Sequence, residues 1–312
     1  MDVVGGGERQ LRAYLKYLNS REASIRLYDM WNPLLDEADI LHCFSVMPGT
    51  LELCGYVKNR GLKLVVSPNL WITPETRNNY PYDLIWNHFE LADAIVVNSV
   101  LEKQTLSRTF SFPEEKFHIV YNGVEPDFVS PADSNEFISA FDVRTPYVLN
   151  VANVEPRKNQ LRFLKALLRE RPDLSLIVVG GVRDEAYAQA CREIGGDRFR
   201  IVGMLPYAST MLRSALCGCS FFAMPSLLET PSIAAIEAAA MGARILLTEQ
   251  GATTEYFGPT VTYVSPESDE SIASGIHSVL ESDVTNSQWL ARDRYLWPQV
   301  IPEALKIYKS LM

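Results

Sequence analysis

The chain has 312 residues, of which 47% are hydrophobic, and its formal net charge is −9. This length is typical of two α/β domains of about 150 residues each. The negative charge disfavours non-specific binding to nucleic acid, which requires a positive surface. The five cysteines are an odd number without a C-x-x-C spacing, so they indicate neither a disulfide framework nor a zinc site. They fit a reducing cytoplasm, and we find neither an apolar run of about 18 residues nor a secretion signal.

The first half of the chain alternates between short β-branched runs and helical stretches. This alternation predicts parallel βαβ units. Asn122 and Gly123 predict a turn where this half ends. The runs lie at 39–43, 62–67, 94–98 and 117–121, and we expect helices at 48–60, 82–91 and 100–110.

A glycine triplet, Gly5 to Gly7, precedes a helix that we expect to begin near Glu8. Such a loop lets backbone amides approach an anionic ligand closely, although a glycine triplet is more often a flexible terminus. Arg9, Arg12 and Lys16 follow at helical spacing. An ordinary solvated face explains these three better than a contact with anionic lipid.

From Tyr147 onward, strands and helices alternate regularly. This pattern predicts a doubly wound parallel sheet with helices on both faces. Residues 124–146 indicate a linker with a short helix around 135–141. Gly180 and Gly181 close one strand without the spaced glycines of a nicotinamide-binding loop, so a nicotinamide-dependent oxidoreductase is a weak alternative.

The loop 154–159 follows the first strand of this second half and precedes a helix. It places two cations, Arg157 and Lys158, at the carboxyl edge of the predicted sheet. Both could be ordinary surface charges. Their place in a loop at the ligand-binding edge favours contact with a phosphate group.

The stretch 219–258 predicts a strand, a loop, a short helix, a second strand and a second loop. We expect Thr230 to be the N-cap of the helix and Pro231 its first residue. The amides of Ser232 and Ile233 would then face the crevice where parallel sheets bind ligands. This arrangement favours an anion site.

Two carboxylates, Glu229 and Glu237, flank the start of this helix. Taken singly, each is explained by a solvated surface or by the helix dipole. Glu237, however, lies within the sequence Ile-Ala-Ala-Ile-Glu-Ala-Ala-Ala, where a solvated face would show more polar residues. A carboxylate in such a setting needs a partner, such as ligand hydroxyls.

The sequence predicts no metal site. Three of the four histidines, His42, His118 and His277, lie in apolar or helical patterns that indicate packing or surface positions. His88 has no second ligand at metal spacing. The chain also lacks an Asp-x-Asp motif.

The run PSLLETPSIAAIEAAAMG…TEQGATTEYFG resembles the signature of the retaining glycosyltransferases of family 4, which adopt the two-domain GT-B fold. LADAIVVNSVLEKQTL and FHIVYNGVEPDFVSP resemble segments of that family's amino-terminal domain. The resemblance implies two Rossmann-like, doubly wound domains that face a cleft. They would be an acceptor-side domain over 1–143, a nucleotide-sugar domain over 144–292, and a last helix over 293–312 that crosses back. The family places a full strand before its glycine loop, whereas four residues precede it here, so we expect a shortened first domain.

The resemblance also implies roles for single residues. Glu237 would hold the ribose hydroxyls, Glu229 would orient the donor sugar, and Lys158 would grip the diphosphate. The family's arginine falls on Asn153, and we expect Arg157 to substitute for it. The implied catalytic residues are Glu229 and Lys158, and the implied donor-binding residues are Gly5, Gly6, Asn153, Arg157, Lys158, Ser232, Ile233 and Glu237.

This chain departs from the family pattern at three places. Thr230-Pro231-Ser232 replaces the usual Gly-Phe-Gly, and Ala252 replaces a second glycine after Gly251. The segment that begins at Ser67 lacks the histidine that family members commonly carry there. We therefore assign no catalytic histidine.

The expected function is that of a retaining, metal-independent glycosyltransferase of the hexosyltransferase type. Its donor would be a UDP- or GDP-linked sugar, a substrate rather than a cofactor, and its acceptor a glycan or a lipid-linked glycan. Cell-surface polysaccharide or glycolipid synthesis in the cytoplasm is the expected setting, with peripheral contact to the inner face of a membrane left open. A non-catalytic sugar-nucleotide or glycan-binding relative is the alternative. The base, sugar, acceptor and oligomeric state are not predicted.

Overall fold

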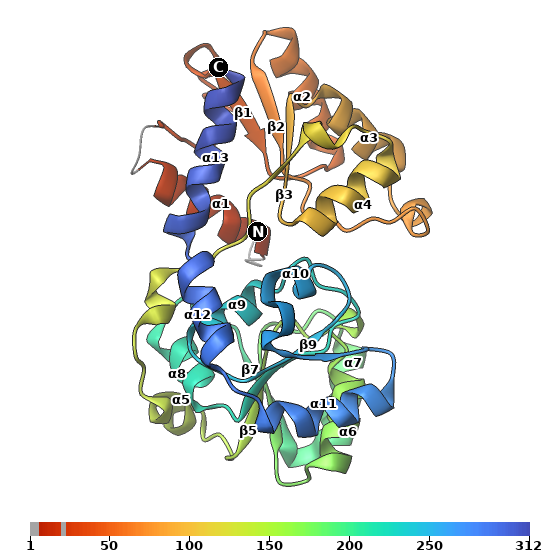
Figure 1. Ribbon diagram of the computed structural model, residues 1–312, viewed down its shortest axis with the longest axis vertical. Helices are drawn as coiled ribbons and strands as arrows, with labels where there is room; N and C mark the ends of the chain where they lie inside the picture. Colours follow the sequence, from red (N-terminus) through yellow and green to blue (C-terminus); the bar gives the residue numbers. More distant parts are fainter. Residues whose placement is uncertain (1–5, 20–22) are drawn as a thin grey trace. The chain divides into compact units, whose positions relative to one another are not determined.

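The computed structural model describes residues 6–19 and 23–312 (Figure 1). The chain forms two compact units. The first contains the residues up to Gly123 together with Trp297–Met312, and the second contains Val124–Leu296. Each unit is built around its own parallel sheet.

The first unit has a four-stranded parallel sheet in the order β1-β2-β3-β4. Its strands are β1 (Ile40–Cys43), β2 (Lys63–Val66), β3 (Ala94–Val97) and β4 (Phe117–Ile119). Its helices are α1 (Gly6–Leu18), α2 (Pro48–Asn59), α3 (Tyr82–Leu91), α4 (Val100–Phe110) and α13 (Trp297–Leu311).

Strand β3 is buried throughout, and β2 is exposed only at its first residue, Lys63. Such continuous burial is typical of parallel strands that are covered on both faces. Helices α2, α3 and α4 share one hydrophobic core with β2 and β3, while α13 packs against α1 (Figure 1). The helices α2, α3 and α4 lie where the sequence predicts them, and α1 is already helical at Gly6, the first described residue.

The second unit has a six-stranded parallel sheet in the order β10-β9-β8-β5-β6-β7. Its strands are β5 (Tyr147–Val151), β6 (Ser175–Val179), β7 (Phe199–Gly203), β8 (Phe221–Met224), β9 (Ile245–Thr248) and β10 (Thr262–Val264). Its helices are α5 (Ser134–Phe141), α6 (Gln160–Glu170), α7 (Glu185–Gly195), α8 (Thr210–Gly218), α9 (Ile233–Ala240), α10 (Thr253–Phe257), α11 (Asp269–Glu281) and α12 (Thr285–Arg294).

The strand order of the second sheet reverses between β5 and β8. From β5 the chain builds outward through β6 and β7, then returns to pair β8 with β5 and builds in the other direction through β9 and β10. This is the doubly wound topology that the sequence predicts. In such sheets, ligands bind outside the carboxyl ends of the strands, at the point where the order reverses.

Helices α6, α7 and α11 pack against one face of this sheet in a single hydrophobic core. Among the described residues, no helix is both long enough and apolar enough to cross a membrane. The same described part of the chain contains no group of three or more His, Cys, Asp or Glu residues arranged to hold a metal ion.

Candidate active site

The loop after β5 carries Lys158 to the point where the strand order reverses. One turn of 3-10 helix, Pro156–Lys158, ends at this lysine. Its Nζ donates to Oε1 of Glu229, 71 residues further along the chain, at 2.6 Å. Both side chains are largely withdrawn from solvent, Lys158 being 13% exposed and Glu229 8% exposed. The structure thus joins the two predicted catalytic residues, one from the loop after β5 and one from the loop after β8.

Arg157 approaches the same carboxylate from the exposed side. Its Nη1 lies 4.0 Å from Oε1 of Glu229 and donates to the carbonyl of Leu228 at 3.3 Å. Its Nη2 donates to Glu155 at 3.1 Å, and its side chain remains 53% exposed. The guanidinium can therefore turn toward an anion without first leaving a buried site.

Asn153 makes different contacts. Its Oδ1 accepts from the amide of Gly181 at 3.3 Å, and its carbonyl accepts from Gln160 at 2.9 Å. The first bond links the loops after β5 and β6, and the second joins the loop after β5 to the start of α6. Of the two residues considered for the family's arginine position, Arg157 is the one that the structure places beside Lys158 and Glu229.

Backbone bonds to the loop after β9 hold Glu229 in place. Its amide donates to Gln250 at 3.2 Å, and its carbonyl accepts from Ala252 at 3.0 Å. Gly251, between these partners, has a φ of +98°, and a Cβ there would overlap the carbonyl oxygen of Glu229. Glycine is required at this position, because both the left-handed backbone and the close approach exclude a side chain.

Helix α9 begins two residues later than the sequence predicts. Ser232, not Thr230, is its N-cap, and the Ser232 Oγ accepts from the amide of Ala235 at 3.3 Å. Pro231 lies before the helix, whose first residue is Ile233. The expectation for Thr230 and Pro231 was wrong because serine caps a helix at least as well as threonine does.

The first-turn amides of α9 are therefore those of Ile233 and the residue after it, while the amide of Ser232 belongs to the preceding loop. Amides in the first turn have no partner within the helix and point beyond its N-terminus. Glu237 begins the second turn and is 0% exposed. The other residues of α9 are also buried, so Glu237 lies on no solvated face, as the sequence predicts.

Two further predicted donor-binding residues lie in the first part of the chain. Gly5 lies outside the described residues. Gly6 is the first residue of α1 in the first unit, and it is exposed. The glycine loop predicted before this helix is thus helical from Gly6 onward.

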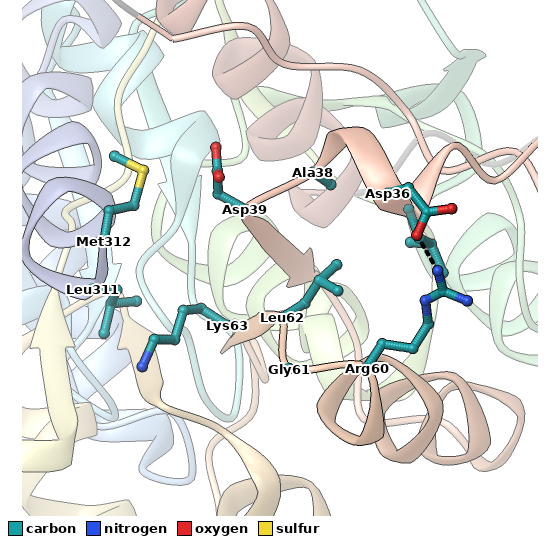
Figure 2. Close-up of a pocket in the computed structure, with 10 residues that line it drawn as sticks. Asp36, Ala38, Asp39, Arg60, Gly61, Leu62, Lys63, Leu311 and Met312 are labelled. Atoms are coloured by element: carbon teal, nitrogen blue, oxygen red, sulfur yellow. Dashed lines mark hydrogen bonds and ion pairs between the residues drawn. The ribbon is translucent and has the colours of Figure 1, made fainter.

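A pocket of about 420 Å³ in the first unit is not part of this site. It lies where β1 and β2 begin, and it is bordered by an ion pair between Asp36 and Arg60 (Figure 2). Asp39 and Lys63 come from the starts of the two strands, and Met312 from the end of the chain. Parallel sheets bind ligands at the opposite, carboxyl edge of their strands.

His42, at the carboxyl edge of the first sheet, has a structural setting. Its Nδ1 lies 2.5 Å from the hydroxyl of Tyr308, its Nε2 lies 2.8 Å from Oγ of Ser67, and its ring stacks on Phe44. Burial lowers the pKa of His42 to about 3, so the ring is neutral at physiological pH. This agrees with its prediction as a packing residue.

Comparison with known proteins identifies the family. A family model described as Glycosyl transferases group 1 matches residues 132–294, just over half of the chain. The chain belongs to this family. A second model, Glycosyltransferase Family 4, matches residues 2–128. Together the two matches cover most of the chain. The family resemblance found in the sequence is confirmed.

The curated relatives are distant. An uncharacterized glycosyltransferase of Methanocaldococcus jannaschii is 25% identical over 72% of this chain and 61% of its own length. The alpha-maltose-1-phosphate synthase of Mycolicibacterium smegmatis is 24% identical over 71% of this chain and 64% of its own length. A Campylobacter jejuni N-acetylgalactosaminyltransferase, named for a diphospho-undecaprenol-linked substrate, is 24% identical over 62% and 52%. The matched part of the chain thus spans less than two thirds of these relatives.

Solved structures confirm the fold. Anabaena HepE, in crystals with UDP and glucose, superposes with a TM-score of 0.80 at 16% identity, over 98% of this chain and 96% of that one. Sucrose-phosphate synthase from Thermosynechococcus elongatus gives a TM-score of 0.70 at 18% identity, over 88% and 74%. At these identities the likeness concerns the fold, and it confirms the two predicted parallel-sheet α/β domains.

The role of Asn159 was not predicted from the sequence. This residue precedes a helix, and an asparagine there normally predicts an N-cap. Its side chain makes no capping bond to α6, and it contacts two other loops of the site instead. A local signal for its backbone did exist, because asparagine is enriched in the left-handed conformation that it adopts.

Proposed function

We propose that this protein is a retaining, metal-independent glycosyltransferase that moves a sugar from a nucleoside diphosphate sugar to an acceptor hydroxyl. One observation carries the proposal. The buried pair of Lys158 and Glu229 lies at the reversal point of the second sheet, with Arg157 beside it. Helix α9 begins four residues after Glu229 and carries the buried Glu237.

In the proposed complex, the diphosphate lies between the first-turn amides of α9 and the cations Lys158 and Arg157. Helix N-termini and paired cations are both suited to phosphate oxygens. Glu237 accepts hydrogen bonds from the ribose hydroxyls, and Glu229 accepts from hydroxyls of the donor sugar. Glu229 pairs with Lys158 at 2.6 Å, so donor binding would exchange one ion pair for another.

The proposed transfer breaks the bond between the anomeric carbon and the diphosphate oxygen and forms a bond to the acceptor oxygen on the same face. The acceptor proton passes to the departing diphosphate. Lys158, Arg157 and the amides of α9 stabilise the charge that develops on the leaving group, and such electrostatic stabilisation commonly contributes more to catalysis than any other effect. Glu229 orients the sugar in this scheme and forms no covalent bond.

The relatives support particular substrates. The structures of Anabaena HepE contain UDP and UDP-glucose, which favours a UDP-linked donor here. The name of the Campylobacter relative includes a lipid-linked diphosphate acceptor, which favours a lipid-linked glycan as acceptor. We therefore propose a role in cell-surface polysaccharide or glycolipid synthesis at the cytoplasmic side of a membrane.

A thermal-shift panel with UDP, GDP, ADP and NAD tests the donor site first. A ligand that binds the folded state raises the melting temperature by mass action. We expect UDP to stabilise the wild-type protein and to stabilise Glu237→Gln less. The Lys158→Ala variant should also bind UDP more weakly, as measured by calorimetry. Lys165 is an exposed cation on α6, and the Lys165→Ala variant should keep the wild-type affinity. Stabilisation by NAD alone would contradict the proposal.

Transfer itself is tested by nuclear magnetic resonance of the anomeric proton, with UDP-glucose and a panel of simple acceptors. Retention of configuration supports the proposed same-face displacement, and inversion refutes it. Turnover that persists at full rate in EDTA supports metal independence. A protein that binds UDP yet neither transfers nor hydrolyses any UDP-sugar across the panel would instead be a non-catalytic sugar-nucleotide-binding relative.

A further inference from the structure

Asn159 follows Lys158 directly and ties together three loops at the carboxyl edge of the second sheet. Its Nδ2 donates to the carbonyl of Pro225, in the loop after β8, at 3.0 Å. The same nitrogen donates to the carbonyl of Pro266, in the loop after β10, at 2.8 Å. An amide nitrogen carries two hydrogens, so both are used. The residue is only 8% exposed, and water therefore competes little for these bonds.

Both the backbone and the side chain of Asn159 serve these loops rather than the helix that follows. The residue occupies the N-cap position of α6, but its side chain makes no capping bond. Its backbone is left-handed, with φ 60° and ψ 23°, which ends the 3-10 turn of Lys158 and starts α6. Asparagine tolerates this conformation better than other residues with a side chain do.

The backbone of Lys158 is held on both sides. On one side, Asn159 is bonded to the loop after β8. On the other side, the carbonyl of Arg157 accepts from the amide of Leu227 in that same loop at 2.9 Å. The Lys158 side chain then reaches Glu229 at 2.6 Å. These contacts involve Pro225, Leu227 and Glu229, which are alternate residues of the loop after β8. Lys158 is therefore anchored to the segment that carries its partner.

We propose that Asn159 is a positioning residue of the donor site, which fixes the point from which the Lys158 ammonium meets the diphosphate. The inference rests on the proposed function, because the role of Lys158 comes from it. Displacing a reacting or binding group by about 1 Å can cost up to roughly 100-fold in rate. The two hydrogen bonds of Asn159 are what prevents such a displacement.

A double-mutant cycle tests this role, with UDP affinity measured by calorimetry. Asn159→Gly keeps the left-handed backbone accessible and removes both donors. We expect it to weaken UDP binding roughly tenfold, within the roughly 100-fold loss that displacement of a binding group can cause. In a Lys158→Ala background the same change should cost nothing more, because the residue acts through the lysine. A merely structural role would cost the same in both backgrounds.

Asp142→Gly is the matched control. Asp142 is another left-handed residue of the second unit, with φ 46°, and it caps α5 away from the three loops. UDP should bind this variant as it binds the wild type. Asn159→Ala also removes both donors and adds no charge, so it replaces the glycine variant if that variant fails to melt cooperatively.

Unchanged UDP affinity in the variant of Asn159, or an additive loss in the double variant, would overturn the positioning role and leave the proposed function intact. A wild-type protein that binds none of UDP, GDP and ADP would overturn the proposed function and this inference with it. A tenfold loss that disappears in the Lys158→Ala background supports both.

Discussion

A single carboxylate organises the charges of the candidate site. Glu229 accepts from Lys158 at 2.6 Å and lies 4.0 Å from Arg157. Breaking a buried ion pair by removing one partner leaves the other uncompensated, and this is costly unless a ligand takes its place. In the proposed complex, the diphosphate takes the place of Glu229 as the partner of Lys158. The two residues are coupled, and single substitutions should affect binding and turnover unequally.

Glu229→Gln should lower kcat about 100-fold and change the donor KM little. The glutamine can still accept from Lys158, but it lacks the charge that we propose acts on the sugar in the transition state, and such a loss appears in kcat. Steady-state kinetics with UDP-glucose measure both constants. Glu193→Gln on α7, an exposed glutamate bonded to Gln189, is the control and should match the wild type. A rise in KM at unchanged kcat would contradict the role of Glu229.

Cys43 should be the most readily alkylated cysteine at neutral pH. A hydrogen bond from the Cys54 thiol lowers the pKa of Cys43 to about 7. Cys217 is an exposed residue, but partial burial of its thiol raises its pKa. A lowered pKa means that the thiolate of Cys43 is present above about pH 7 and is lost below it. Iodoacetamide labelling followed by peptide mass spectrometry should show this midpoint. Cys54→Ala should move the midpoint up, toward the ordinary value of about 8.5.

At the scale of elements, the site is assembled from loops that follow different strands, and backbone bonds fix these loops. The loop after β8 is bonded to the loop after β9 through Glu229, and to the loop after β5 through Leu227. Helix α9 can lie close beneath them because most of its side chains are alanine. These bonds restrict the loop that carries Glu229 relative to its two neighbours. Gly251, which lies between the partners of Glu229, is therefore a structural requirement.

Gly251→Ala should lower the free energy of unfolding by roughly 3 kcal/mol. The φ of +98° is strained for alanine, and its Cβ would overlap the Glu229 carbonyl. Gly61→Ala is the matched control, because Gly61 also has a positive φ, 84°, but open space around it. It should cost only about 1 kcal/mol. Urea unfolding of the two variants gives the comparison, and equal losses would show that the close approach to Glu229 does not matter.

Most elements could be predicted from the sequence, because parallel strands buried on both faces leave unmistakable apolar runs. Strand β8, helix α9 and strand β9 follow one another as expected. The start of α9 was missed, since Thr230 and Ser232 are both good caps and Pro231 suits a first turn. The family resemblance identified Lys158 and Glu229 as site residues. Their direct bond spans 71 residues, and no local pattern encodes such a contact.

At the scale of the whole molecule, the second unit is continuous in sequence and the first is not. Residues 124–296 enter and leave their unit at adjacent points, where Val124 pairs with Leu296 and donates to Tyr295 at 2.8 Å. The first unit is completed by α13, which contributes the fully buried Trp297. A segment with its own sheet, its own core and neighbouring ends has the properties of an autonomous domain.

Residues 124–296, expressed alone, should therefore fold cooperatively. The fragment should bind UDP with an affinity within about threefold of that of the full chain, because Lys158, Arg157, Glu237 and α9 all lie in this unit. Circular dichroism during urea unfolding tests the folding, and calorimetry tests the binding. Glu237→Gln within the fragment should weaken UDP binding as it does in the full chain, which shows that the same site is measured. The fragment should transfer no sugar, because the acceptor side is assigned to the first unit. A folded fragment that binds no UDP, beside a full chain that does, would mean that the first unit supplies essential donor contacts.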